Sequence, residues 1–163
     1  LVRATDETPL NAVSPEKVET WEGFEFIEAL SGAGECVCGP QHFGGVSART
    51  DPDRAGAGTE YVCADGGRIQ NVGEKAVKSL SDDGVKLNVT FQLTAVDRPL
   101  ISVAKLTAAG HCVRFEPDHA TIVNIASGRE TYVEKKNGVY VLRMWVPAAA
   151  RLSEPSSSGG TRQ

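Results

Sequence analysis

At Phe24-Glu25-Phe26-Ile27-Glu28-Ala29-Leu30-Ser31-Gly32-Ala33-Gly34, an apolar-rich run of the sequence changes abruptly into small residues. The first part of this stretch predicts a β-strand, because successive side chains of a strand point to opposite faces. Small residues after a strand let the backbone come close to a ligand, a second copy or a packed neighbour. The chemistry available at this turn therefore depends on Leu30, the residue that precedes it.

Composition limits what the chain can do. Its 163 residues are 40% hydrophobic and 23% charged, which is typical of a soluble globular domain with a core of its own. A net charge of -4 provides no basic surface for nucleic acid or for an anionic membrane. The longest apolar run, Val139 to Val146, is interrupted by Arg143 and is too short to span a bilayer.

Three segments differ in composition. Residues 1–20 carry two prolines and no clear period, and we expect an extended N-terminal arm; residues 21–147 carry the patterned domain. Residues 148–163 become rich in Ser, Gly and Pro, so we expect a tail that is mobile in isolation and is held by another chain in an assembly. The chain starts at Leu1 without a signal peptide, which is compatible with a fragment or with an organellar protein, for example of the chloroplast, after removal of a targeting segment.

Strand-like patterns dominate the domain, so we expect a mainly β fold with one short helix. The clearest strand is Lys86 to Ala95, where apolar and polar residues alternate and one face should be core and the other polar. The helix is expected at about Val103 to Ala109, with Ser102 capping its start and Gly110 ending it. The other expected strands are Trp21 to Ala29, Ala76 to Leu80, Val113 to Phe115, Ala120 to Ile125, Glu130 to Val133 and Val139 to Val146.

Two turns stand out between these strands. Asp65-Gly66-Gly67 predicts a hairpin, because glycine adopts the positive φ that tight hairpin turns need. Asn137-Gly138 is the strongest turn signal in the chain for the same reason.

A further pattern extends from the helix to the end of the domain. It consists of Pro99-Leu100-Ile101-Ser102-Val103-Ala104-Lys105-Leu106, then Gly110, Val113 and Phe115, then Asn137-Gly138-Val139-Tyr140-Val141-Leu142. With the strand and small turn at its start, this order resembles a retropepsin-like aspartic protease domain of the copia retrotransposon type. The resemblance covers about Phe24 to Val146 and implies a closed β-barrel or sandwich. It also implies that Asp65, Gly66 and Gly67 belong to a flap hairpin that could contact a bound peptide.

In that family the small turn reads Asp-Ser-Gly-Ala or Asp-Thr-Gly-Ala, and a two-fold dimer brings two aspartates together to share a proton. Here the matching residues are Leu30, Ser31, Gly32 and Ala33. Leucine cannot hold a proton or polarise water, so the resemblance implies a degenerate site with no catalytic residue. Glu28 lies two residues upstream on the same strand face, but its backbone position does not suit this role.

Other residues suggest different chemistry. Cys36, Cys38 and His42 could bind zinc or copper with help from Cys63 or the His111-Cys112 pair, but their spacing matches no standard metal motif, and reduced thiols in a core are the simpler interpretation. Ser31 could be a nucleophile only with a base, and the histidines at 42, 111 and 119 lie in turn-like or strand-edge contexts. We therefore expect no metal and no cofactor.

Three functional hypotheses remain. The first is a catalytically inactive retropepsin-like domain that serves as a structural or binding subunit of a larger assembly, for example an organellar or photosynthetic complex. The second is a peptide-binding module that keeps the protease cleft and flap, and the third is an active dimeric aspartic endopeptidase. The expected partners are other protein subunits or a second copy of the chain, with no nucleic acid and no membrane span.

Overall fold

The computed structural model describes residues 20–26, 30–51 and 58–149, and within them the protein is mainly β with one short helix, as the sequence predicts. The predicted arm and tail lie outside the described residues, except for residues 20, 148 and 149. The elements in chain order are β1 Trp21–Phe26, β2 Leu30–Ser31, β3 Val37–Cys38, β4 Glu60–Val62, β5 Arg68–Gln70, β6 Gly73–Val77, β7 Val89–Leu93, β8 Ile101–Ser102, α2 Val103–Ala108, β9 His111–Phe115, β10 His119–Asn124, β11 Glu130–Lys136 and β12 Val139–Pro147.

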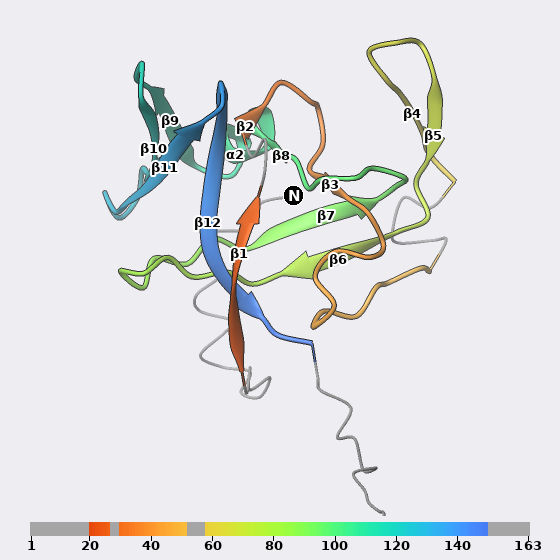
Figure 1. Ribbon diagram of the computed structural model, residues 1–163, viewed down its shortest axis with the longest axis horizontal. Helices are drawn as coiled ribbons and strands as arrows, with labels where there is room; N and C mark the ends of the chain where they lie inside the picture. Colours follow the sequence, from red (N-terminus) through yellow and green to blue (C-terminus); the bar gives the residue numbers. More distant parts are fainter. Residues whose placement is uncertain (1–19, 27–29, 52–57, 150–163) are drawn as a thin grey trace, which may run out of the picture.

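The described strands form four separate sheets (Figure 1). A five-stranded antiparallel sheet has the order β1-β12-β11-β10-β9, and a three-stranded sheet has the order β3-β7-β6. β2 pairs in parallel with β8, while β4 and β5 form a two-stranded hairpin that stands apart from the body at the upper right of Figure 1. The resemblance implies a closed β-barrel or sandwich, but none of these sheets closes into a barrel, because several strands are only two or three residues long and pair with one neighbour.

β12 is the strand that joins the two halves of the largest sheet. Its first residues, Val139–Val141, pair with β11, and Leu142–Pro147 pair with β1. Near its end, the backbone of Trp145 also exchanges two hydrogen bonds with Leu80, from the loop after β6. One nine-residue strand therefore connects β1 to the meander of β9, β10 and β11 (Figure 1).

The turn into β12 follows the sequence prediction. Asn137 and Gly138 have φ values of 50° and 82° and connect β11 to β12 as a two-residue hairpin loop. Positive φ at both central residues gives a turn whose twist matches that of the flanking strands. The Asn-Gly prediction is confirmed.

The core is organised around Phe43, which has 2% of its surface exposed although it lies in a loop. Its ring lies between Phe24, at a centroid distance of 4.5 Å, and Phe91, at 5.0 Å. The loop is held by the buried ammonium of Lys75, which donates to the carbonyl oxygens of Pro40, His42 and Phe43 at 3.3, 2.8 and 3.2 Å. These contacts offset the cost of a φ of 58° at a bulky side chain.

The boundaries of two predicted strands need correction, and β9 and β11 are longer than predicted, at His111–Phe115 and Glu130–Lys136. β6 is Gly73–Val77 rather than Ala76 to Leu80, because the Glu74 backbone pairs with Arg49 and β6 pairs with β7 from Gly73 onward. β7 is Val89–Leu93 rather than Lys86 to Ala95, and its predicted polar face is not solvated, since Thr90 and Thr94 are 9% and 1% exposed. β1 is described over Trp21–Phe26, and residues 27–29 of the predicted first strand lie outside the described residues.

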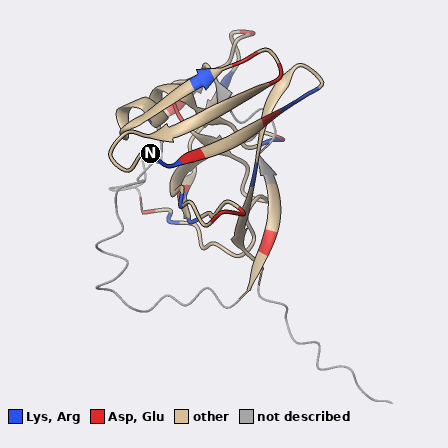
Figure 2. Cartoon of the chain, turned by 90° about the vertical axis from the view of Figure 1, so that its left-hand side faces the viewer, with Lys and Arg blue, Asp and Glu red and all other residues tan. Residues whose placement is uncertain are grey.

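Charged side chains are interspersed over the described surface. Figure 2 shows Lys and Arg mixed with Asp and Glu on the strands, without one extended face of a single sign. In the part of the chain that the structure describes, the helix is too short to cross a membrane.

Candidate functional site

The turn after β2 is the first part of the candidate site. Leu30 and Ser31 pair in parallel with Ile101 and Ser102 of β8, so the small turn emerges directly above the start of α2. A Cβ added to Gly32 or Gly34 would meet no atom within 4 Å, which leaves the outer side of the turn open. Leu30, the residue at which the resemblance would place an aspartate, is the first residue of β2.

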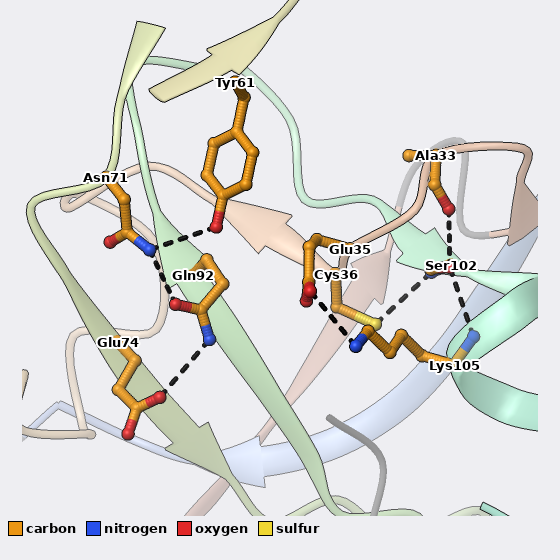
Figure 3. Close-up of polar contacts among 9 residues, drawn as sticks. All are labelled: Ala33, Glu35, Cys36, Tyr61, Asn71, Glu74, Gln92, Ser102 and Lys105. Carbon is orange, nitrogen blue, oxygen red and sulfur yellow. Dashed lines mark hydrogen bonds and ion pairs between the residues drawn. The ribbon is translucent and has the colours of Figure 1, made fainter. Parts of the chain in front are cut away.

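Ser102 holds the turn from below (Figure 3). Its hydroxyl donates to the carbonyl of Ala33 at 2.5 Å and accepts from the backbone N–H of Lys105 at 3.2 Å. Its own backbone N–H donates to the sulfur of Cys36 at 3.3 Å. Ser102 is 0% exposed, so one buried residue joins the turn, the segment after it and the helix.

The helix prediction is confirmed at both ends. Ser102 is the N-cap residue of α2, and its side chain accepts from the third helical N–H. Ala109 ends the helix, and Gly110 follows with a φ of 93°. Leu106 is the buried residue of α2 and anchors it in the core.

An ion pair lies beside the turn. The Nζ of Lys105 is 3.0 Å from Oε1 of Glu35, and the two side chains are 28% and 33% exposed. Glu35 follows the small turn directly in sequence, and Lys105 lies in α2 (Figure 3). The neighbour of this carboxylate is therefore a cation. Catalysis of the aspartic-protease type requires a second carboxylate there instead.

The predicted hairpin is the second part of the site. β4 and β5 pair antiparallel, and the turn between them is closed by hydrogen bonds between Cys63 and Gly67 and from Gly66 to Cys63. Asp65 accepts the Gly67 N–H at 2.8 Å, and Gly66 has a φ of 87°. Asp65, Gly66 and Gly67 are all exposed, so the hairpin prediction is confirmed and its tip faces solvent.

A row of polar side chains fixes the base of this hairpin (Figure 3). The side-chain nitrogen Nδ2 of Asn71 donates to the Tyr61 hydroxyl at 3.0 Å and to the side-chain oxygen Oε1 of Gln92 at 2.7 Å. Gln92 in turn donates to Glu74 at 3.3 Å. Burial raises the pKa of the Tyr61 hydroxyl, which also lies within electrostatic range of Glu35 and Lys105. The hairpin base and the region beside the turn are thus electrostatic neighbours.

Sequence reasoning missed this polar row. The detectable signal was Asn71-Val72-Gly73, because Oδ1 of Asn71 accepts the Gly73 N–H at 2.8 Å in a local Asx turn. Such a turn explains a polar residue between two strands. It does not reveal that the same side chain, 2% exposed, reaches Tyr61 and Gln92.

The structure gives the proposed metal ligands other roles. In the described residues no three His, Cys, Asp or Glu side chains are grouped so that they could hold a metal ion. Nδ1 of His42 accepts the Gly39 N–H at 2.8 Å, which leaves Nε2 to donate to the Asp97 carbonyl at 3.0 Å. Burial raises the pKa of the Cys36 thiol, and it raises that of Cys38 to about 12, so both thiols favour the neutral form, which is a poor metal ligand.

The remaining candidates are dispersed. Cys63 is half-buried in the hairpin, and Cys112 is exposed on β9. Burial lowers the pKa of His111, whose Nδ1 lies 3.2 Å from the Leu106 carbonyl, and His119 pairs with Asp118 at 2.8 Å. Ser31 lies in β2, and its side chain is outside what the structure describes.

Comparisons add no relative to this picture: no family model matches the chain, and searches of curated proteins and of solved structures likewise found no match.

Replacing Ser102 tests its role beneath the turn. We expect Ser102→Ala to lower the free energy of unfolding by about 2 kcal/mol, because it removes a helix cap and the hydrogen bond to Ala33. Urea unfolding measures the loss, and faster amide exchange at Lys105 would locate it. Thr107→Ala, at an exposed position of the same helix, is the control and should change stability by less than about 0.5 kcal/mol. Equal losses in the two variants would contradict this role.

The buried Cys38 thiol predicts a loss of stability in alkali. Its pKa is about 12 in the folded chain against an ordinary value of 9.0, so its contribution is complete below pH 9 and is lost as the pH rises toward 12. Over this range we expect the unfolding free energy of the wild type to fall by about 1 kcal/mol per pH unit more than that of Cys38→Ala. Urea unfolding from pH 8 to pH 11 measures the slopes. Cys112→Ala should keep the wild-type slope, and parallel lines for wild type and Cys38→Ala would refute the prediction.

Proposed function

We propose that this chain is a catalytically inactive retropepsin-like domain that serves as a structural or binding subunit of a larger protein assembly. The observation that carries the proposal is the turn at Leu30–Ala33, which is held from below by Ser102 although it carries no acidic residue. If this backbone conformation served no purpose, the chain could lose it, because a buried polar group that is only partly hydrogen-bonded destabilises the fold. We infer that the shape of the turn serves contact rather than chemistry.

The order of the elements supports the family assignment. A strand ends in the small turn, a glycine-rich hairpin follows, and a short capped helix follows β8. This is the order that the resemblance to copia-type proteases implies. The meander of β9 to β11 and the long β12 follow the helix, and β9 and β12 contain the last residues on which the resemblance rests.

The side chains around the turn support the absence of catalysis. General acid–base chemistry of the aspartic type requires two carboxyl groups that share a proton. Leu30 supplies none, and Glu35 is paired with Lys105. Glu28, the other acidic residue near the turn, lies outside the described residues.

The proposal includes a second copy of the chain as one candidate partner. A retropepsin site consists of two halves, and this chain has a single turn of the required kind. The open outer side of Gly32 and Gly34 is compatible with close approach of either a second copy or a different subunit.

Restoring the acid tests the inherited site. In Leu30→Asp we expect cleavage of an unstructured protein substrate at about pH 5, inhibited by pepstatin, because paired aspartates work while sharing a proton. Wild type and the uncharged isostere Leu30→Asn should show no cleavage, and circular dichroism should show all three folded. Cleavage by the wild type would overturn the assignment of inactivity. A folded Leu30→Asp variant that neither cleaves nor binds pepstatin would overturn the retropepsin-like assignment.

A second candidate function is binding of an extended peptide between the hairpin and the turn. It is favoured by the β4–β5 hairpin, whose tip is exposed and whose base is held rigidly by Asn71. An extended peptide could add to such a hairpin through backbone hydrogen bonds.

For this function, Gly67→Trp should abolish binding on an array of extended peptides, because a large side chain at the hairpin tip would obstruct the peptide. Ala95→Trp, at an exposed position outside the hairpin, is the matched control and should leave binding unchanged. Binding that survives Gly67→Trp would exclude this mode.

A further inference from the structure

A glycine in the middle of β1 has no role that the fold explains. Gly23 pairs in register with Trp145 of β12, and its φ is not in the left-handed region. A Cβ added there would meet only a carbon of the Trp145 ring at 3.9 Å, an ordinary contact, so the fold has room for a side chain. Glycine weakens a strand interior, and where it is not needed for conformation it often marks close approach by another molecule.

Trp145 forms one wall of the space above Gly23. Its indole N–H donates to Oδ1 of Asp82 at 2.7 Å, and its backbone exchanges two hydrogen bonds with Leu80. The ring is therefore held in place, yet 43% of the residue is exposed. Because internal contacts already order this tryptophan, a partner that binds its large exposed surface causes little further loss of side-chain entropy.

A hollow of about 270 Å³ adjoins this ring and is lined by Gly23, Asp82, Arg143, Met144 and Trp145. The hollow lies along the middle of the β1–β12 pair, whereas Leu30 and Ser31 of the small turn pair with β8. The hollow is therefore a surface separate from the small turn, and binding at the hollow does not depend on the function proposed for the turn.

β1 is also an edge strand. In the described part of the chain its strand neighbour is β12, and no other strand pairs along its outer side. Such an edge presents backbone N–H and C=O groups to an incoming extended segment.

The charges around this edge favour a cationic partner. Glu22 is exposed on β1, and Asp82 and Asp83 are exposed in the loop beside Trp145. Two cations of the described residues lie nearby: Arg143 lines the hollow, and Arg129 donates to the Asp83 backbone carbonyl at 3.1 Å, so the three carboxylates outnumber them. Asp82 accepts one indole N–H, which leaves acceptor capacity on its carboxylate.

We propose that the outer edge of β1 docks an extended basic segment of a partner polypeptide, with a lysine or arginine side chain lying over Gly23 against Trp145 and Asp82. The segment adds to the sheet as a further strand. Its cationic side chain takes the space that a side chain at position 23 would fill, stacks on the indole and pairs with the carboxylate.

Synthetic peptides test this docking directly. The probe is the acetylated, amidated heptapeptide Thr-Val-Thr-Lys-Thr-Val-Thr, with matched peptides that have glutamine or glutamate at the centre. Titration is followed by NMR through the amides of residues 21–26 and the indole N–H of Trp145. We expect the lysine peptide to bind about two- to fivefold more tightly than the glutamine peptide, and the glutamate peptide to bind most weakly, as suits an exposed cation–π and ionic contact.

Two variants separate docking from a structural role. Asp82→Asn keeps an acceptor for the indole but removes the charge, so the lysine peptide should lose its advantage over the glutamine peptide. Asp97→Asn, an exposed aspartate elsewhere, should leave that advantage intact. Gly23→Val should keep or raise the melting temperature, since valine favours strands, while weakening the lysine peptide at least about fivefold.

Several results would overturn the proposal. These are an indole resonance that no peptide shifts, an unchanged lysine preference in Asp82→Asn, or a lower melting temperature in Gly23→Val. Light scattering supplies one more: if the wild type forms a dimer that Gly23→Val disrupts, a second copy occupies this edge and the proposed basic partner is wrong.

Discussion

The buried hydroxyl of Ser102 is the contact on which the arrangement of the candidate site depends. It donates to Ala33, accepts from Lys105 and belongs to the strand that pairs with Leu30 and Ser31. Ala33 is 69 residues away in sequence and Lys105 only three, so one side chain joins a long-range and a local constraint. Because it is fully buried, loss of either partner would leave a polar group without water to replace it.

In the core and along β12, a single residue or strand likewise contacts several elements. Lys75 donates hydrogen bonds to three backbone carbonyl groups of a loop whose Phe43 ring fills the space between Phe24 and Phe91. β12 pairs first with β11 and then with β1, so it fixes the position of β1 relative to the meander of β9, β10 and β11. Short strands that would be marginal alone are therefore stabilised by a few residues with partners on several elements.

The two halves of the candidate site are fixed by different networks. The turn is supported by Ser102, whereas the hairpin base is supported by Asn71 and Gln92. Burial is the main cause of the raised pKa of Tyr61 at the hairpin base, and the charges of Glu35 and Lys105 beside the turn have a smaller influence on it. None of these contacts requires an aspartate at position 30, so the turn and the hairpin base keep their geometry with leucine there.

The sequence by itself determined the elements whose rules are local: the mainly β character, the Ser102 cap, the Gly66 hairpin and the Asn137–Gly138 turn. These follow from backbone φ preferences and from side chains that bond within a few residues. Tertiary structure alone decided the strand limits, the separate sheets, the burial of Thr90 and Thr94, and the polar row through Asn71. Those features depend on partners distant in sequence, and single-chain patterns carry no record of which distant groups will meet.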